Sequence, residues 1–272
     1  MARILRFGAT AFFCLGIVGL QAQGTAALSL SHDSTVRINS PSTHMSGSGS
    51  LVGDLYVLTC FHVIASVQVA NNNAQVAILQ DLKITMPSGE TIDGDVVSTP
   101  TDQEQEPLYY DFAFVKLRHK PTKGFAKVQL ASEAEQPHLG DDVAFSGYPL
   151  EAPGMVTHRG MVSGFNDGRD IIFVEAPINK GNSGGALLSK DGHVVGLISM
   201  REGGINQGLA NLREQIIASS RNMTVRFAGV DTLGATRSLI DTLDEYISTG
   251  IGYARSIQFA RSYMQKHPEL FK

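Results

Sequence analysis

Gly181-Asn182-Ser183-Gly184-Gly185 is a stretch in which one hydroxyl side chain stands among glycines. Glycine has no Cβ and adopts backbone conformations that strain other residues, so this run predicts a sharp turn that carries Ser183. Backbone N–H groups around a Gly-x-Ser turn can point at the oxygen that becomes negative during acyl transfer, and we expect Gly181 and Ser183 to supply these oxyanion-hole donors. The stretch therefore predicts that Ser183 is a nucleophile.

A serine hydroxyl is a weak nucleophile until a neighbouring base takes its proton, so Ser183 needs partners elsewhere in the chain. The apolar run 57–64 (VLTCFHVI) contains a single imidazole, that of His62. The run 111–117 (DFAFVKL) places one carboxylate, Asp111, at the start of a β-prone segment. The order His62, Asp111, Ser183 is one of the orders in which a catalytic triad occurs along a chain, so we predict His62 as the base and Asp111 as the group that orients it.

Further motifs lie on both sides of these three residues. They are GSGSL at 47–51, YVLT at 56–59, LGD at 139–141, VAFSGYP at 143–149, GMVS at 160–163, INKGNSGG at 178–185 and GIGYA at 250–254. With the His62 and Asp111 contexts, this set resembles the chymotrypsin-fold (trypsin-like) serine proteases. It is most similar to the bacterial branch that includes the HtrA/DegP and glutamyl-endopeptidase type enzymes. The similarity extends from about Ser46 to Met200, and 250–254 resembles the closing strand of that family.

The resemblance implies an all-β fold of two antiparallel six-stranded β-barrels with an active-site cleft between them, followed by C-terminal helices. Runs of Val, Ile, Phe and Thr separated by Gly, Pro, Asn and Asp independently predict many short antiparallel strands. The expected strands are 55–59, 82–86, 92–98, 112–117, 142–146, 155–163, 171–175, 186–188 and 193–199. We expect the first barrel over about 34–120, the second over about 126–260, a helical insertion over about 204–249 and a C-terminal helix over about 256–267.

Helical periodicity appears only in the last part of the chain. One apolar face carries Leu239, Ile240, Leu243 and Ile247, and a second carries Ile257, Ala260 and Met264. Because residues three and four apart share a face of a helix, both segments predict amphipathic helices that pack on the barrels.

The chain departs from the family pattern in three places. Cys60 stands two residues before His62, where another residue type is commoner, and we interpret it as a small buried hydrophobe. The stretch from Gly204 to Gly250 is longer than the family needs to join its strands. The sequence ends at Lys272, so we expect no PDZ module of the kind that many HtrA relatives carry.

Substrate specificity is inferred from the resemblance, which assigns the substrate pocket to Pro177, Ile178, Ser199 and Met200. The sixth residue before the nucleophile, Pro177, carries no acidic group that would hold an Arg or Lys side chain. We therefore expect small or medium apolar P1 residues.

The N-terminus predicts export. Arg3 and Arg6 precede an apolar run over 7–20, and small residues follow between Ala22 and Ala27. This is the arrangement of a secretory signal peptide, so we expect 1–24 to be the signal and 25–272 the protease domain of a periplasmic or secreted protein; an uncleaved anchor is the alternative. Cleavage would leave Cys60 as the only thiol, which excludes an intramolecular disulfide.

Composition disfavours other functions. A net charge of −4 without a run of Lys or Arg argues against nucleic-acid binding. The sequence contains neither a His-Glu-x-x-His motif nor two cysteines at the spacing of metal ligands, so we expect no metal and no cofactor. An α/β-hydrolase esterase would place its histidine after the serine. A serine endopeptidase acting on proteins or peptides is the predicted function, and the alternative is a catalytically latent binding or chaperone-like module of the same fold. Oligomeric state is not predicted.

Overall fold

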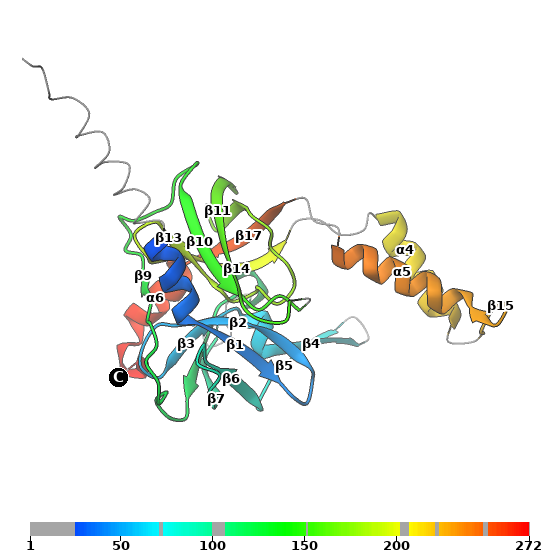
Figure 1. Cartoon of the computed structure of the whole chain (residues 1–272), viewed down its shortest axis with the longest axis horizontal. Helices are drawn as coiled ribbons and strands as arrows, with labels where there is room; N and C mark the ends of the chain where they lie inside the picture. Colours follow the sequence, from blue (N-terminus) through cyan, green and yellow to red (C-terminus); the bar gives the residue numbers. More distant parts are fainter. Residues whose placement is uncertain are drawn as a thin grey trace, which may run out of the picture.

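The computed structural model describes residues 25–70, 73–99, 107–150, 152–201, 207–220, 223–246 and 250–271. Two β-barrels form the body of the protein, and a pair of helices stands away from them (Figure 1). A helix over 25–34 precedes the first strand and packs on the second barrel, where Ser31 Oγ donates a 2.9 Å hydrogen bond to Ser146 Oγ. The predicted signal peptide, 1–24, lies outside the described residues.

The first barrel closes because β1 is hydrogen-bonded to both β2 and β6. Its six antiparallel strands are β1 (Thr35–Ser40), β2 (Met45–Leu51), β3 (Tyr56–Thr59), β6 (Leu82–Thr85), β7 (Thr91–Ser98) and β8 (Ala113–Leu117). In β6 the apolar Leu82 and Ile84 are buried and alternate with the half-buried Lys83 and Thr85. This alternation places one face of each strand in the core.

The second barrel closes through β13, which pairs with both β10 and β14. Its strands are β10 (Asp142–Gly147), β11 (Val156–Phe165), β12 (Ile171–Glu175), β13 (Ala186–Ser189), β14 (His193–Arg201) and β17 (Ile251–Ser256). The short β9 (Gln129–Leu130) adds to β14 in parallel. The predicted all-β fold of two antiparallel six-stranded barrels is therefore confirmed.

One hydrophobic core continues through both barrels. Phe112 and Phe114 of the first barrel and Phe145 of the second are among its largest fully buried side chains. The C-terminal helix α6 (Gln258–Lys266) packs on this core through Ala260 and Tyr263, and a turn of 3-10 helix, η2 (Pro268–Phe271), follows it. The predicted packing of the C-terminal helix on the barrels is confirmed.

All the predicted strands occur, but the barrel strands β1 and β2 and the short β9 were not predicted. A separate hairpin of β4 (Ala65–Ala70) and β5 (Asn73–Ile78), which follows the one-turn helix α2 (Phe61–Ile64), was not predicted either. None of the helices in the described part of the chain is long and apolar enough to cross a membrane.

The insertion differs from its prediction. It forms two helices, α4 (Gln207–Ser220) and α5 (Thr232–Tyr246), joined by the small hairpin of β15 (Arg226–Phe227) and β16 (Val230–Asp231). These helices pack on each other, and in Figure 1 the pair stands clear of both barrels. The prediction that this segment packs on the barrel was wrong, because α4 supplies the partner that the apolar face of α5 requires.

An ion pair and buried apolar side chains stabilise the helix pair. Arg213 of α4 forms a 2.6 Å ion pair with Asp241 of α5. Ile216 and Ile240 are buried although neither belongs to the core of the barrels. The insertion therefore has a small core of its own.

The insertion should be removable without loss of the barrels. Arg201 at the end of β14 is paired with Gly252 of β17, so a short turn can join the two strands. We expect replacement of residues 203–250 by a four-residue Gly-Ser turn to shift the thermal midpoint by no more than about 4 °C, because few contacts of the barrels are lost. Thermal unfolding followed by circular dichroism measures the shift. A product that does not melt cooperatively would contradict this prediction.

Candidate active site

His62 reaches the site from α2, directly after the buried strand β3. Its neighbours Phe61, Val63 and Ile64 are buried, whereas 36% of the His62 side chain is exposed. Three apolar side chains thus fix this single turn to the core and leave the imidazole at the surface.

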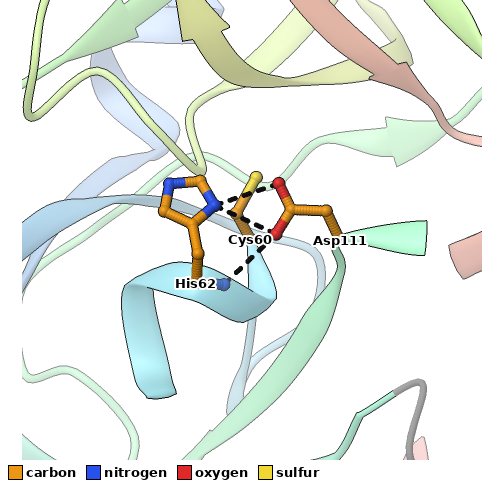
Figure 2. Close-up of side chains that lie close together, drawn as sticks. All are labelled: Cys60, His62 and Asp111. Atoms are coloured by element: carbon orange, nitrogen blue, oxygen red, sulfur yellow. Dashed lines mark hydrogen bonds and ion pairs between the residues drawn. The ribbon is translucent and has the colours of Figure 1, made fainter. Parts of the chain in front are cut away.

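Asp111 stands two residues before the start of β8, with its carboxylate buried against His62 (Figure 2). Both carboxylate oxygens lie 3.0 Å from His62 Nδ1, and the backbone N–H of His62 donates to Oδ1 at 3.2 Å. Ser199 Oγ of β14 donates to Oδ2 at 2.5 Å. Because a carboxylate only accepts, Nδ1 must carry a proton, which leaves the lone pair of Nε2 on neutral His62 free to act as a base.

Ser183 lies in the loop between β12 and β13 and contacts the same strand, β14. Its hydroxyl donates a 2.9 Å hydrogen bond to the carbonyl oxygen of Ser199. Within the described part of the chain no hydrogen bond joins Ser183 to His62. The structure therefore brings His62 and Asp111 into direct contact and connects Ser183 to them through Ser199.

The backbone of the loop that carries Ser183, the predicted nucleophile, requires its glycines. Gly181 and Gly184 have φ values of +96° and +87°. A Cβ at Gly181 would lie 2.1 Å from the carbonyl oxygen of Tyr148, and one at Gly184 would lie 2.1 Å from that of Ser48. The N–H groups of Gly181 and Ser183 donate to no other group in the described structure, so the expected oxyanion-hole donors are free.

Ser48 of β2 was not singled out by sequence reasoning, yet it binds the nucleophile loop. Its Oγ donates to the Gly181 carbonyl at 2.7 Å, and its N–H donates to the Ser183 carbonyl at 2.8 Å. The signal available in the sequence is a small hydroxyl residue between two glycines in GSGSL.

Cys60 lies beside the His62–Asp111 pair and is fully buried (Figure 2). Its thiol donates to the Ile198 carbonyl at 3.3 Å. Burial raises the pKa of this thiol well above its usual range, and the nearby Asp111 carboxylate raises it further. The prediction of a small buried residue is confirmed.

Metal-ligating atoms of Cys60, His62 and Asp111 lie within 4.8 Å of one another, the one group of this kind in the described residues. The protonated thiol is a poor ligand, and His62 Nδ1 is already bound to Asp111. The arrangement therefore suits proton transfer better than metal binding.

The four predicted pocket residues have different environments. Pro177 is exposed, whereas Ile178 is buried so closely against Gly252 that a Cβ there would lie 2.1 Å from Ile178 Cδ1. The Ser199 side chain is directed to Asp111 and holds the carboxylate. The side chain of Met200 lies outside the described structure.

The sequence of this chain is similar to those of known proteins. A family model described as Trypsin-like peptidase domain matches residues 47–197. Serine protease HTRA1 of Xenopus laevis is 30% identical over 167 residues, which are 57% of this chain and 31% of that protein. The HtrA-like serine protease of Staphylococcus epidermidis is 28% identical over 193 residues, or 63% of this chain and 29% of that protein. The chain thus spans about a third of the length of these relatives.

Solved structures share the fold. The Rv3671c protease in its inactive form matches with a TM-score of 0.54 and 17% identity, over 88% of this chain and 91% of that chain. The serine endoprotease from Yersinia pestis matches with a TM-score of 0.55 and 20% identity, over 89% of this chain and 65% of that chain. At such identities the likeness concerns the fold alone.

The burial of Cys60 predicts a thiol that reacts only after unfolding. In a Cys14→Ser variant, we expect the native protein to react with Ellman's reagent at least about 100-fold more slowly than the denatured protein, because reaction requires both opening and a thiolate. Absorbance of the released thiolate measures both rates, and the denatured sample should yield a single equivalent. Rapid stoichiometric reaction of the native protein would contradict the prediction.

Proposed function

The chain belongs to the trypsin-like peptidase family, and on this basis we propose that it is a serine endopeptidase that hydrolyses proteins or peptides through an acyl-enzyme intermediate. One observation carries the proposal. The Ser199 carbonyl oxygen accepts a hydrogen bond from the Ser183 hydroxyl. The Ser199 hydroxyl donates to the carboxylate of Asp111, which binds His62. A nucleophile, a base and an orienting acid are thereby linked through one residue.

In the proposed mechanism, the Ser183 hydroxyl leaves the Ser199 carbonyl and donates to Nε2 of His62. His62 takes the proton as Oγ attacks the peptide carbonyl and then returns it to the leaving amine. Asp111 keeps the Nδ1 proton in place and stabilises the imidazolium that forms. The free N–H groups of Gly181 and Ser183 stabilise the negative oxygen of the tetrahedral intermediate. One such donor raises kcat by on the order of 10²- to 10³-fold.

A catalytically latent binding or chaperone-like module is the second candidate function. The hydrogen bond from Ser183 to Ser199, in place of one to His62, favours it. A latent module would keep this hydrogen bond when a substrate is present, whereas a protease would exchange it for the one to His62.

Covalent labelling distinguishes the two candidates. A fluorophosphonate probe should phosphonylate the protein once with loss of fluoride, and Ser183→Ala should abolish this labelling. Turnover of a peptide substrate should fall by on the order of 10⁶ in Ser183→Ala or His62→Ala, because the triad acts as a unit. Intact mass spectrometry measures the labelling, and Ser88→Ala, which removes an exposed serine, is the matched control. A folded protein that no probe labels would favour the latent module.

The proposed P1 preference follows from the space that Ile178 occupies beside Gly252. We expect cleavage mainly after small or medium apolar residues such as Ala and Val. Ile178→Ala should raise kcat/KM for Leu or Phe relative to Ala by at least about tenfold, because pocket volume decides this selectivity. A peptide panel read by mass spectrometry measures it.

The control is Ile172→Ala, which removes the same atoms from a buried position in the second barrel. Dominant cleavage after Arg or Lys, or the same shift in selectivity in both variants, would overturn the preference.

A further inference from the structure

The two residues before Asp111, on the one-turn helix α3 (Pro107–Tyr110), reach from the first barrel to the second. The Tyr109 hydroxyl donates a hydrogen bond to Asp170 Oδ2, next to the start of β12. The Tyr110 ring packs edge-on against Phe259 of α6, with centroids 4.5 Å apart and an interplanar angle of 85°. The segment that carries Asp111 is thus attached both to Asp170 of the second barrel and to the C-terminal helix α6.

Asp170 is held in place by β17 of its own barrel and by α6. Its Oδ1 accepts a 3.0 Å hydrogen bond from Gln258 Nε2, and its backbone carbonyl accepts from the Ser256 N–H at 2.8 Å. The acceptor that Tyr109 meets is therefore already positioned, so little conformational freedom is lost when the hydrogen bond forms.

Arg255 of β17 completes the contact. Its side chain is buried, and its Nη1 has no hydrogen-bond partner in the described structure. The guanidinium lies over the Tyr109 ring, 5.3 Å from the centroid. An aromatic face attracts a cation that is withdrawn from water, so the ring of Tyr109 stabilises this buried charge.

Asp111 needs such a support because its partners lie on different barrels. His62 belongs to the first barrel, and Ser199, which donates to the same carboxylate, belongs to the second. Asp111 also has a left-handed backbone with φ of +44°, a conformation that its surroundings must hold. A shift of the segment by a fraction of an ångström would lengthen hydrogen bonds on one side or the other.

We propose that Tyr109 and Asp170 form a latch between the barrels that positions Asp111, so that both are positioning residues for the triad. The effect of this latch on the catalytic rate rests on the proposed protease function. Tyr109 is 40% exposed, so water can hydrate its hydroxyl when Asp170 is removed. The hydrogen bond therefore adds little to global stability, and its loss should appear in the geometry and rate of the site.

The test compares Tyr109→Phe, Asp170→Ala, their double variant and Asp170→Asn. Tyr109→Phe and Asp170→Ala should each lower kcat about tenfold with KM unchanged, because displaced catalytic groups cost rate more than binding. The double variant should be no slower than either single variant, since both remove the same hydrogen bond. Asp170→Asn keeps an acceptor oxygen and should recover part of the rate.

Tyr110→Phe is the matched control, because the neighbouring hydroxyl makes no hydrogen bond within the described residues and should keep kcat within twofold. A second readout needs no activity: the His62 N–H donates to Asp111, so its hydrogen exchange reports the position of that carboxylate. We expect about tenfold faster exchange in Tyr109→Phe and Asp170→Ala, with an unchanged thermal midpoint.

Unchanged kcat and unchanged exchange in Tyr109→Phe would overturn the latch. Losses that are additive in the double variant, or that Tyr110→Phe reproduces, would overturn it as well. If the wild-type protein has no activity, the protease proposal fails, and the exchange of the His62 N–H still decides the latch.

Discussion

The contact of Ser48 with the nucleophile loop is the constraint on which the site depends. This buried serine of the first barrel donates from its side chain to Gly181 and from its backbone to Ser183, and its Oγ accepts from the Tyr148 N–H at 2.9 Å. With these bonds the first barrel fixes the direction of the carbonyl groups in a loop of the second. The N–H groups of Gly181 and Ser183 are left without acceptors in the described structure, as an oxyanion hole requires.

Close approach of the two barrels explains why glycine recurs around this contact. At Gly147, a Cβ would lie 2.7 Å from Asn182 Oδ1 and 3.1 Å from Ser48 Oγ. At Gly184, it would lie 2.2 Å from Thr59 Oγ1 as well as against the Ser48 carbonyl. Side chains at these positions would push the barrels apart. Gly47, where a Cβ would lie 3.2 Å from the Ser183 carbonyl oxygen, belongs to the same interface as Gly147 and Gly184, although the three are distant in sequence.

Local patterns predicted the short antiparallel strands and residues that meet in the site, because alternation, turn residues and short motifs are properties of neighbouring residues. The two barrels were implied by the family resemblance that those motifs carry. The Tyr109–Asp170 contact joins residues 61 positions apart and has no local pattern. Ser199 could be assigned to the site but not to Asp111, since its contact with Asp111 depends on how β14 of the second barrel lies against the first barrel. The packing of α5 on α4 escaped prediction for a similar reason: an amphipathic face shows that a partner exists without showing which one.

Ser183 and Asp111 differ in how firmly the structure holds them. Ser183 exchanges one hydrogen bond for another when it turns from Ser199 to His62, and such exchanges change the free energy by only about 1 kcal/mol. Asp111 is held by His62, by Ser199 and by the aromatic contacts of the residues before it. A group bound beside Ser183 can therefore select its orientation, whereas the His62 imidazole is oriented before anything binds. The hydrogen bond from Ser183 to Ser199 is therefore compatible with a His62–Asp111 pair that is already in place.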